Sequence, residues 1–343
     1  MISLGIVAAL GAAACGTSVQ HGASNAGAQK SKTAKIAIVP AGPHPYFAPM
    51  PKGIKQAKGD FNLTNITYQV PATWSLSDQN KTIESLVSQG YNAFAMFPGD
   101  ANGSNATISE LASHGIPTVT IGGCTRSPTK AKFCLATDVK KEAYQAAKQL
   151  IKAIGGKGKI VHFTSNLTDP NTKPREQGVA RAVRETHGKV KLVQTIAGTD
   201  SPDKAGPAVR SLLAARGNKI DGIMSTAYTD SVALAKELMQ SNPHHIKVIG
   251  IDADPTVIKG IKKDAVTATI DQNPYGQAYI ATYALNQMVS HGCRMKDKSS
   301  PHIDSGTIVV TKRNADHYLD NLRALTKKIQ STFKQKYLTC PSS

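Results

Sequence analysis

Polar and aromatic side chains recur directly after short apolar runs of this sequence. The first run, KIAIV at 35–39, is followed by PHPYF, which places His44 beside the adjacent rings of Tyr46 and Phe47. Adjacent rings draw attention because aromatic residues make up only 5% of the chain. The same arrangement returns after later runs. The side chains singled out at these positions are His44, Tyr46, Phe47, Trp74, Asp100, Asn102, Arg175, Tyr228, Thr229, Asp252 and Gln272.

This combination of groups suits a ligand that carries both hydroxyl groups and apolar C–H faces. Rings such as Tyr46, Phe47 and Trp74, the only tryptophan, can stack on C–H faces. Carboxylates, amides and a guanidinium can bond hydroxyl groups, and a hydrogen bond to a charged partner contributes about 1.5–3 kcal/mol against about 1 kcal/mol for a neutral one. Acidic and basic groups roughly balance, so an anionic ligand is not required. The set therefore indicates a sugar or a polyol.

Each of these residues also has a purely structural interpretation. Tyr46 or Phe47 can belong to the core, and Arg175 can be a surface residue of its helix. Asp252 can cap a helix that begins near Pro255, because aspartate is favoured at that position. The functional interpretation depends on the recurrence of such groups after successive runs rather than on any one of them.

Short apolar runs alternate with segments of helical periodicity along the whole chain. The runs are rich in β-branched residues, and Ile83, Leu86 and Val87 illustrate the one-sided apolar spacing of the helical segments. The runs lie at 35–39, 66–70, 92–97, 117–121, 159–163, 190–194, 221–225, 247–251, 266–270 and 306–310. This alternation predicts two α/β domains with parallel sheets, doubly wound by helices. Ligands of such sheets bind beyond the carboxyl ends of the strands, so the polar and aromatic side chains that follow the runs are expected in one cleft.

The N-terminus has the pattern of an export signal. Residues 1–15 form an uncharged apolar stretch that ends in small residues and Cys15, which indicates a lipoprotein signal with a lipid on the Cys15 sulfur. Two features depart from that pattern: no basic residue precedes the apolar run, and Ala12 stands where leucine is usual. An ordinary cleaved signal and a buried helix remain the alternatives. Residues 16–34 are small and polar and are expected to be a flexible tether.

The other four cysteines favour an oxidising compartment. Cys124 and Cys134 enclose a short basic loop, and a bond between Cys293 and Cys340 would tie the C-terminal tail to the body. We expect these two disulfides, with free thiols as the alternative. Zinc is disfavoured because neither pair has CxxC spacing.

Several classes of function are disfavoured. The net charge is +18, but basic residues are dispersed along the chain, so no nucleic-acid partner is expected. The one biased region is the tail, which has no acidic residue after Asp320; a solvated helix face and a contact with an anionic membrane both explain it. Nucleotide-binding and hydrolase motifs are absent from the sequence. The protein is therefore expected not to be an enzyme and to need no cofactor and no metal.

Several segments together resemble one known family. They are KIAIVPAGPHPYF, HGIPTVTIGG, KPREQGVARAV, KVIGIDADP, VTATIDQNPYGQA and IVVTKRNADHYL, spread over about residues 35–319. They resemble the periplasmic sugar-binding proteins of the ribose-binding type, which are solute receptors of ABC importers. The resemblance implies that Tyr46 and Phe47 stack on the sugar. The hydroxyl-binding residues that it implies are Asp100, Arg175, Asp252 and Gln272.

Two departures from the family pattern argue against ribose itself. Thr229 stands where the family has asparagine, and a ring expected near Thr199 is missing. The resemblance implies the type I periplasmic-binding-protein fold with three crossings between its lobes. The N-terminal lobe would then comprise 35–137 and 274–305, and the C-terminal lobe 138–273 and 306–314, with a C-terminal helix and tail at 315–343.

The resemblance also implies the biological setting. We expect an exported monomer on the extracytoplasmic face of the cell envelope, attached to the membrane only through its lipid anchor. It would deliver a sugar, polyol or similar ligand to the permease subunits of an ABC transporter. A chemotaxis or quorum-signal receptor on the same scaffold is the alternative. A regulator of the lactose-repressor type is disfavoured because a signal and tether occupy the place of its DNA-binding helices.

Overall fold

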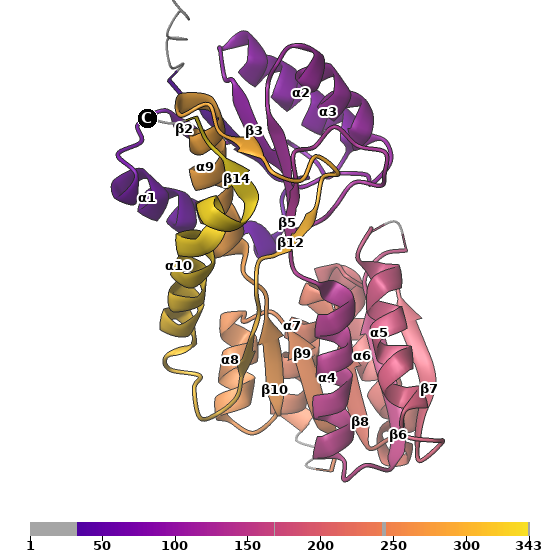
Figure 1. Cartoon of the computed structure of the whole chain (residues 1–343). Coiled ribbons are helices and arrows are strands. Elements are labelled where there is room, and N and C mark those ends of the chain that lie inside the picture. The colour runs from indigo at the N-terminus through magenta and orange to yellow at the C-terminus, as the bar shows by residue number, and fades with distance from the viewer. Residues whose placement is uncertain (1–32, 168, 242–244, 342–343) are drawn as a thin grey trace, which may run out of the picture. The chain divides into compact units, whose positions relative to one another are not determined.

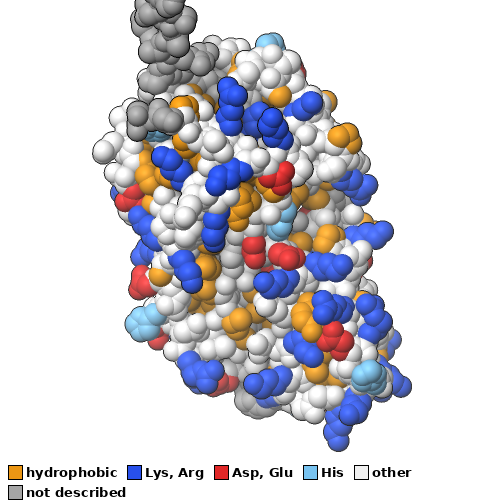
Figure 2. All heavy atoms as spheres, viewed as in Figure 1, with side chains coloured by type: hydrophobic (Ala, Val, Ile, Leu, Met, Phe, Trp, Pro, Cys, Tyr) orange, Lys and Arg blue, Asp and Glu red, His pale blue; other side chains and the backbone are white. Residues whose placement is uncertain are grey.

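The computed structural model describes residues 33–167, 169–241 and 245–341. The predicted signal, the lipidation of Cys15 and nearly all of the predicted tether lie outside these residues. Among the helices of the described ranges, none is both long and apolar enough to cross a membrane. Lys and Arg side chains are spread over the face of the molecule shown in Figure 2, as their dispersal in the sequence implies.

The first sheet has six strands, all paired in parallel, in the order β12-β5-β4-β3-β1-β2. The bounds of its strands are β1 Ile36–Val39, β2 Ile66–Tyr68, β3 Ala93–Met96, β4 Thr118–Ile121, β5 Cys134–Ala136 and β12 His302–Asp304. Alternate residues of β1 face opposite layers. Ile36 and Ile38 pack with α1 (Met50–Asp60) and α9 (Pro274–Ser290), and Ala37 and Val39 pack with α2 (Leu76–Ser88) and α3 (Ser104–Ser113).

The second sheet has the order β13-β10-β9-β8-β6-β7. Its strands are β6 Gly158–Thr164, β7 Val190–Ala197, β8 Gly222–Ser225, β9 Lys247–Ile251, β10 Ala268–Asp271 and β13 Ile308–Val310. One face packs against α4 (Val139–Ala153) and α5 (Thr172–Arg184). The other packs against α6 (Pro202–Arg216), α7 (Tyr228–Ser241) and α8 (Pro255–Lys262). Two α/β halves with largely parallel sheets confirm the fold class expected from the sequence.

The edge strand β13 is the antiparallel member of this second sheet. The chain enters β13 directly from β12 of the first sheet, through the short segment 305–307. Parallel strands are joined by long crossover connections, usually with a helix, and no such connection leads into β13. The chain also passes between the sheets from β5 to α4 and from β10 to α9 (Figure 1). These three connections are where the two halves, called lobes below, are joined.

The C-terminal helix α10 (Tyr318–Tyr337) runs beside α9 (Figure 1). Phe333 anchors it, fully buried, against Phe133 of the first sheet layer. After α10, β14 (Leu338–Thr339) pairs with β11 (Arg294–Met295). Both expected disulfides are present. Cys124–Cys134 and Cys293–Cys340 have Cα–Cα distances of 5.5 Å and 4.0 Å.

Candidate ligand-binding site

A cavity of about 460 Å³ lies at the carboxyl ends of strands from both sheets. Its size is in the range usual for small-molecule sites. The first lobe contributes mostly rings, and the second lobe contributes mostly charged groups and amides. The lining residues are Pro43, His44, Tyr46, Trp74, Phe97, Gly99, Gly122, Ser165, Asn166, Asp169, Pro170, Asn171, Arg175, Asp200, Tyr228, Asp252 and Gln272.

The first lobe supplies an aromatic wall, made of His44, Tyr46, Phe47, Trp74 and Phe97. Trp74 is 44% exposed, and its ring stacks on the buried Phe47 with centroids 5.9 Å apart and planes at 27°. Phe97 meets both of these rings edge-on, at 5.5 Å and 5.3 Å. The exposed face of Trp74 is therefore held in place from behind by two rings.

The segment after β1 is rigid for local reasons. Pro45 opens a short 3-10 turn, Pro45–Phe47, for which His44 is the N-cap. The His44 Nδ1 atom accepts a hydrogen bond of 3.2 Å from the Tyr46 N–H, so in the neutral ring the proton is on Nε2. Burial lowers the pKa of His44, although Asp200 and Asp169 act to raise it. The ring is therefore a neutral donor, and it meets Tyr228 of the other lobe edge-on at 5.7 Å.

Tyr46 is held by a second contact. Its hydroxyl donates a hydrogen bond of 3.0 Å to Gln277 Oε1 of α9. Burial raises the pKa of this hydroxyl far above its ordinary value, so the ring remains neutral. Gly42, just before this segment, lies against the backbone of Trp74. A Cβ atom at Gly42 would sit 2.6 Å from the Trp74 nitrogen, so this close approach requires glycine.

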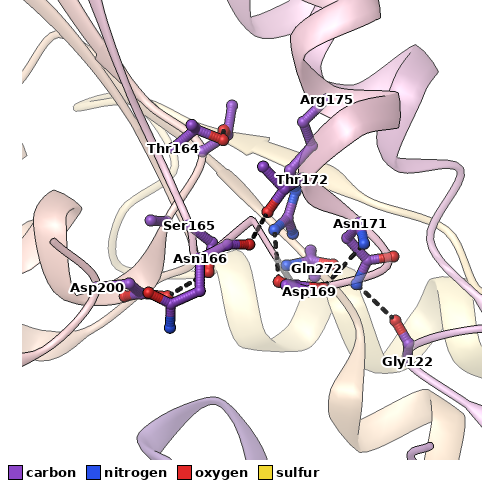
Figure 3. A network of polar contacts seen from close by, with 12 residues as sticks. Gly122, Thr164, Ser165, Asn166, Asp169, Asn171, Thr172, Arg175, Asp200 and Gln272 are labelled. Atoms are coloured by element: carbon purple, nitrogen blue, oxygen red, sulfur yellow. Dashed lines mark hydrogen bonds and ion pairs between the residues drawn. The ribbon is translucent and has the colours of Figure 1, made fainter. Parts of the chain in front are cut away.

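The second lobe supplies a polar wall, centred on Arg175 (Figure 3). The Arg175 side chain extends from the first turn of α5 and is 6% exposed. Its Nη1 atom lies 3.8 Å from Asp169 Oδ2. Next to it, the Gln272 Nε2 atom donates a hydrogen bond of 3.1 Å to Asp252 Oδ1. The guanidinium, the carboxylates and the amide thus present both donors and acceptors to the cavity.

Asp252 occupies an unusual backbone conformation. Its φ is +62°, in the left-handed region that non-glycine residues enter at a cost, which is a common feature of ligand sites. Burial raises its pKa to about 6, although Arg175 and Gln272 act to lower it. Asp252 is therefore largely ionised at neutral pH.

Asp200 forms a second carboxylate corner of this wall. Its Oδ2 atom accepts a hydrogen bond of 2.9 Å from Ser165 Oγ, and its Oδ1 atom accepts one of 2.9 Å from the Thr229 N–H. Nearby, Asn171 Nδ2 reaches the Gly122 carbonyl of the first lobe at 3.4 Å (Figure 3). The polar wall is thus prearranged by its own hydrogen bonds.

The structure brings most of the predicted site residues together. The seven that line the cavity are His44, Tyr46, Trp74, Arg175, Tyr228, Asp252 and Gln272. Four lie outside the lining. Phe47 is buried behind Trp74, and Thr229 reaches Asp200 through its backbone only. Asp100 and Asn102 are exposed, and Asp100 Oδ1 accepts hydrogen bonds from the N–H groups of Asn102 and Gly103 in its own turn.

Five polar residues of the lining were not singled out from the sequence: Ser165, Asn166, Asp169, Asn171 and Asp200. The first four lie between β6 and Arg175, in a segment where only the arginine was chosen. Asp200 was missed for another reason. The strand before it was predicted to end at 194, whereas β7 continues to Ala197, which brings Asp200 close to a strand end. The signal was present, but the predicted boundary was too early.

Known proteins share this sequence pattern and this fold. A family model described as a periplasmic binding protein domain matches residues 36–292. The ribose import binding protein of Bacillus subtilis is 25% identical over 274 residues, which cover 80% of this chain and 86% of the relative. A xylitol-binding protein of Mycolicibacterium smegmatis is 22% identical over 198 residues, covering 58% of this chain and 56% of that protein.

Among solved structures, an ABC transporter solute binding protein of Burkholderia graminis in complex with D-arabinose has a TM-score of 0.76 and 22% identity. The match covers 84% of this chain and 98% of that one. A solute binding protein of Actinobacillus succinogenes with bound D-allose has a TM-score of 0.75 at 20% identity, with 83% and 100% of the two chains covered. These likenesses show the shared fold. The match of the family model over most of the sequence shows that the chain belongs to the periplasmic binding protein domain family.

Proposed function

We propose that this protein captures a sugar, a polyol or a similar small hydroxylated ligand in the cavity between its two lobes. The observation that carries the proposal is the division of the cavity into an aromatic wall and a polar wall. Trp74 offers a flat apolar surface to C–H groups, and Arg175, Asp252 and Gln272 offer donors and acceptors to hydroxyl groups. Relatives named for ribose import and xylitol binding support the same ligand class.

The charge of the lining favours a neutral ligand over an anion. Asp169, Asp200 and Asp252 stand against a single guanidinium, that of Arg175, among the described lining residues. An anionic sugar would face these carboxylates in a partly desolvated site, where like charges repel strongly. Neutral hydroxyl groups instead donate to the carboxylates. A micromolar dissociation constant requires about 8 kcal/mol, which a few charge-assisted hydrogen bonds and ring contacts can supply.

The ligand would also stabilise the closed arrangement of the lobes. Its hydroxyl groups contact the second lobe while its C–H face contacts the first, so both sets of contacts exist together only when the lobes are close. A ligand that binds the closed state better than the open one shifts the population toward closure. We propose that an ABC importer recognises this closed state and receives the ligand from it.

A ligand panel tests the proposed function. Melting temperature and Trp74 emission are measured with D-ribose, D-arabinose, D-xylose, D-allose and xylitol, and with D-glucuronate as the anionic comparison. A ligand at about 100 times its dissociation constant should stabilise the protein by about 2.7 kcal/mol. Replacing Asp252 by Asn should weaken binding by about 10-fold to 100-fold, since a charge-assisted hydrogen bond becomes a neutral one. The matched control Asp203→Asn, an exposed position on α6, should bind as the wild type does. A panel in which only the anion binds would refute the proposal.

We also propose that the mature protein is a monomeric lipoprotein on the extracytoplasmic face of the envelope, with its lipid on Cys15. Family membership and the pattern of residues 1–15 support this setting. Metabolic labelling with a radioactive fatty acid checks it. The wild-type protein should carry label and sediment with membranes, whereas Cys15→Ser should do neither. Equal labelling of both proteins would exclude Cys15 as the lipidated residue.

A further inference from the structure

A buried carboxylate, Glu142, lies on α4, the helix that packs against α5, which carries Arg175. It belongs to the first turn of α4, which starts directly after the first connection between the lobes and is capped by Asp138. Glu142 is 3% exposed, and neither of its carboxylate oxygens has a hydrogen-bond partner among the described residues. A fully buried acid without a partner is costly, so its presence in the fold calls for a role.

The Arg175 guanidinium has a complementary gap in its contacts. Its Nε atom is buried and has no hydrogen-bond partner among the described residues, although Nη1 lies near Asp169. The two helices that carry Glu142 and Arg175 pack very closely. At Gly178 of α5, a Cβ atom would sit 2.2 Å from the Lys140 carbonyl oxygen of α4. The approach of these helices holds the acid and the guanidinium in one buried region.

Electrostatics connects the two groups. Burial lowers the pKa of Arg175, whereas Glu142, and after it Asp169 and Asp252, raise it. The resulting pKa of Arg175 is above its ordinary value. Arg175 is therefore influenced electrostatically by an acid on α4 as well as by two acids at the cavity.

Several acids on other elements act electrostatically on Glu142. They are Asp252 after β9, Asp271 at the end of β10 and Asp304 at the end of β12, and Arg175 of α5 is the cation that opposes them. Burial raises the pKa of Glu142 well above its ordinary value, these three acids raise it further, and Arg175 lowers it. His162 of β6 is also near Arg175, but burial lowers its pKa to about 3, so it is neutral.

We propose that Glu142 is a positioning residue for Arg175 and that its protonation sets the direction in which the guanidinium is drawn. While Glu142 holds its proton, Arg175 is attracted by Asp169 and Asp252 and faces the cavity. When Glu142 ionises, the guanidinium is drawn toward α4 and away from a ligand. The expected effect on ligand affinity rests on the proposed function. The expected effect of Glu142 on the direction of Arg175 does not.

The first experiment needs no ligand. The protein is labelled with 15N-arginine, and the Nε–H resonance of Arg175, assigned from its loss in Arg175→Lys, is followed between about pH 7 and about pH 9, where Asp252, whose pKa is about 6, is already largely ionised. We expect the resonance to titrate in the wild type and to stay constant in Glu142→Gln, which mimics the protonated acid. The control Glu176→Gln, a partly exposed acid next to Arg175, should titrate as the wild type does. An identical titration in Glu142→Gln, or no titration in the wild type, overturns the proposal.

The second experiment follows ligand affinity with D-ribose and D-arabinose by calorimetry over the same pH range. Wild-type affinity should fall by up to tenfold per pH unit once Glu142 ionises, because one proton is linked to binding. The ligand affinity of the Glu142→Gln variant should not fall in this way as the pH rises. Parallel profiles, or loss of binding by Glu142→Gln at every pH, contradict the inference. If neither sugar binds at any pH, that result counts against these two sugars as ligands, and the resonance of Arg175 decides the positioning role.

Stability provides a check on the variant itself. Glu142→Gln removes an acid whose ionisation is disfavoured by burial, so the variant should melt no lower than the wild type at neutral pH. Glu142→Leu, which also lacks the charge, serves as a second variant if the glutamine protein fails to fold. It should give the same constant Arg175 resonance, and a titrating resonance in a folded Glu142→Leu protein would overturn the proposal as well.

Discussion

Gln79 of α2 is predicted to fix the position of the aromatic wall. It is fully buried, and its side chain makes three hydrogen bonds to the loops that follow β1 and β3. Its Nε2 atom donates to the Pro40 carbonyl at 3.0 Å and to the Phe97 carbonyl at 2.6 Å. Its Oε1 atom accepts from the Gly99 N–H at 3.0 Å. One amide thus ties together the two loops that carry His44 and Phe97.

The cost of losing these contacts follows from the groups left behind. Gln79→Leu keeps a similar volume but removes the partners of two carbonyls and one N–H. Each buried polar group left without a partner costs about 1–3 kcal/mol. Three such groups should lower the free energy of unfolding by about 3 kcal/mol or more. That is a large share of the roughly 5–15 kcal/mol that typically stabilises a folded protein. Sugar affinity should fall as well, since Phe97 and Gly99 line the cavity.

Urea unfolding, followed by far-ultraviolet circular dichroism and by the emission of Trp74, measures the effect. The matched control is Gln89→Leu, at the C-terminal end of the same helix, where the exposed side chain donates one hydrogen bond, of 3.2 Å to Ser85 Oγ, among the described residues. It should change the unfolding free energy by no more than about 0.5 kcal/mol. If both variants unfold at the same urea concentration, the reasoning about Gln79 is refuted.

Further predictions concern the C-terminal disulfide, a buried acid and the central arginine. Replacing Cys293 and Cys340 by Ala opens a loop of 47 residues and should lower the unfolding free energy measured in urea by about 4 kcal/mol; an unchanged unfolding free energy would contradict this. Burial raises the pKa of Asp230 to about 7, so the folded state keeps a proton that the unfolded state releases near pH 4. Stability should therefore fall as pH rises from about 4 to about 7, and Asp230→Asn should lack that part of the fall in melting temperature. Arg175→Lys should lower sugar affinity, measured by calorimetry, by at least about tenfold, because an ammonium group cannot reproduce the planar donor pattern of the guanidinium beside Asp169. Unchanged affinity would show that Arg175 does not bind the ligand.

The sequence by itself determined the architecture of this protein. Apolar runs buried on both faces, such as 36–39 and 93–96, can be identified locally, and their alternation with helical segments leaves few arrangements other than two parallel sheets. The expectation that ligand-binding groups follow strand ends came from the same pattern, and seven of the chosen residues do line one cavity. Both cysteine pairings were also expected from their spacing and from the predicted export signal.

Which polar residues face the cavity was decided only by the tertiary structure. Asp100 and Asp200 both follow strands, yet Asp100 bonds the N–H groups of its own turn whereas Asp200 bonds Ser165 and lines the cavity. The difference depends on the path of each loop, which is set by packing with residues distant in the sequence. For the same reason, the burial of Glu142 has no local signal in the sequence. Periodicity reports the environment of a whole element, whereas the direction and the partners of one side chain arise only when elements meet.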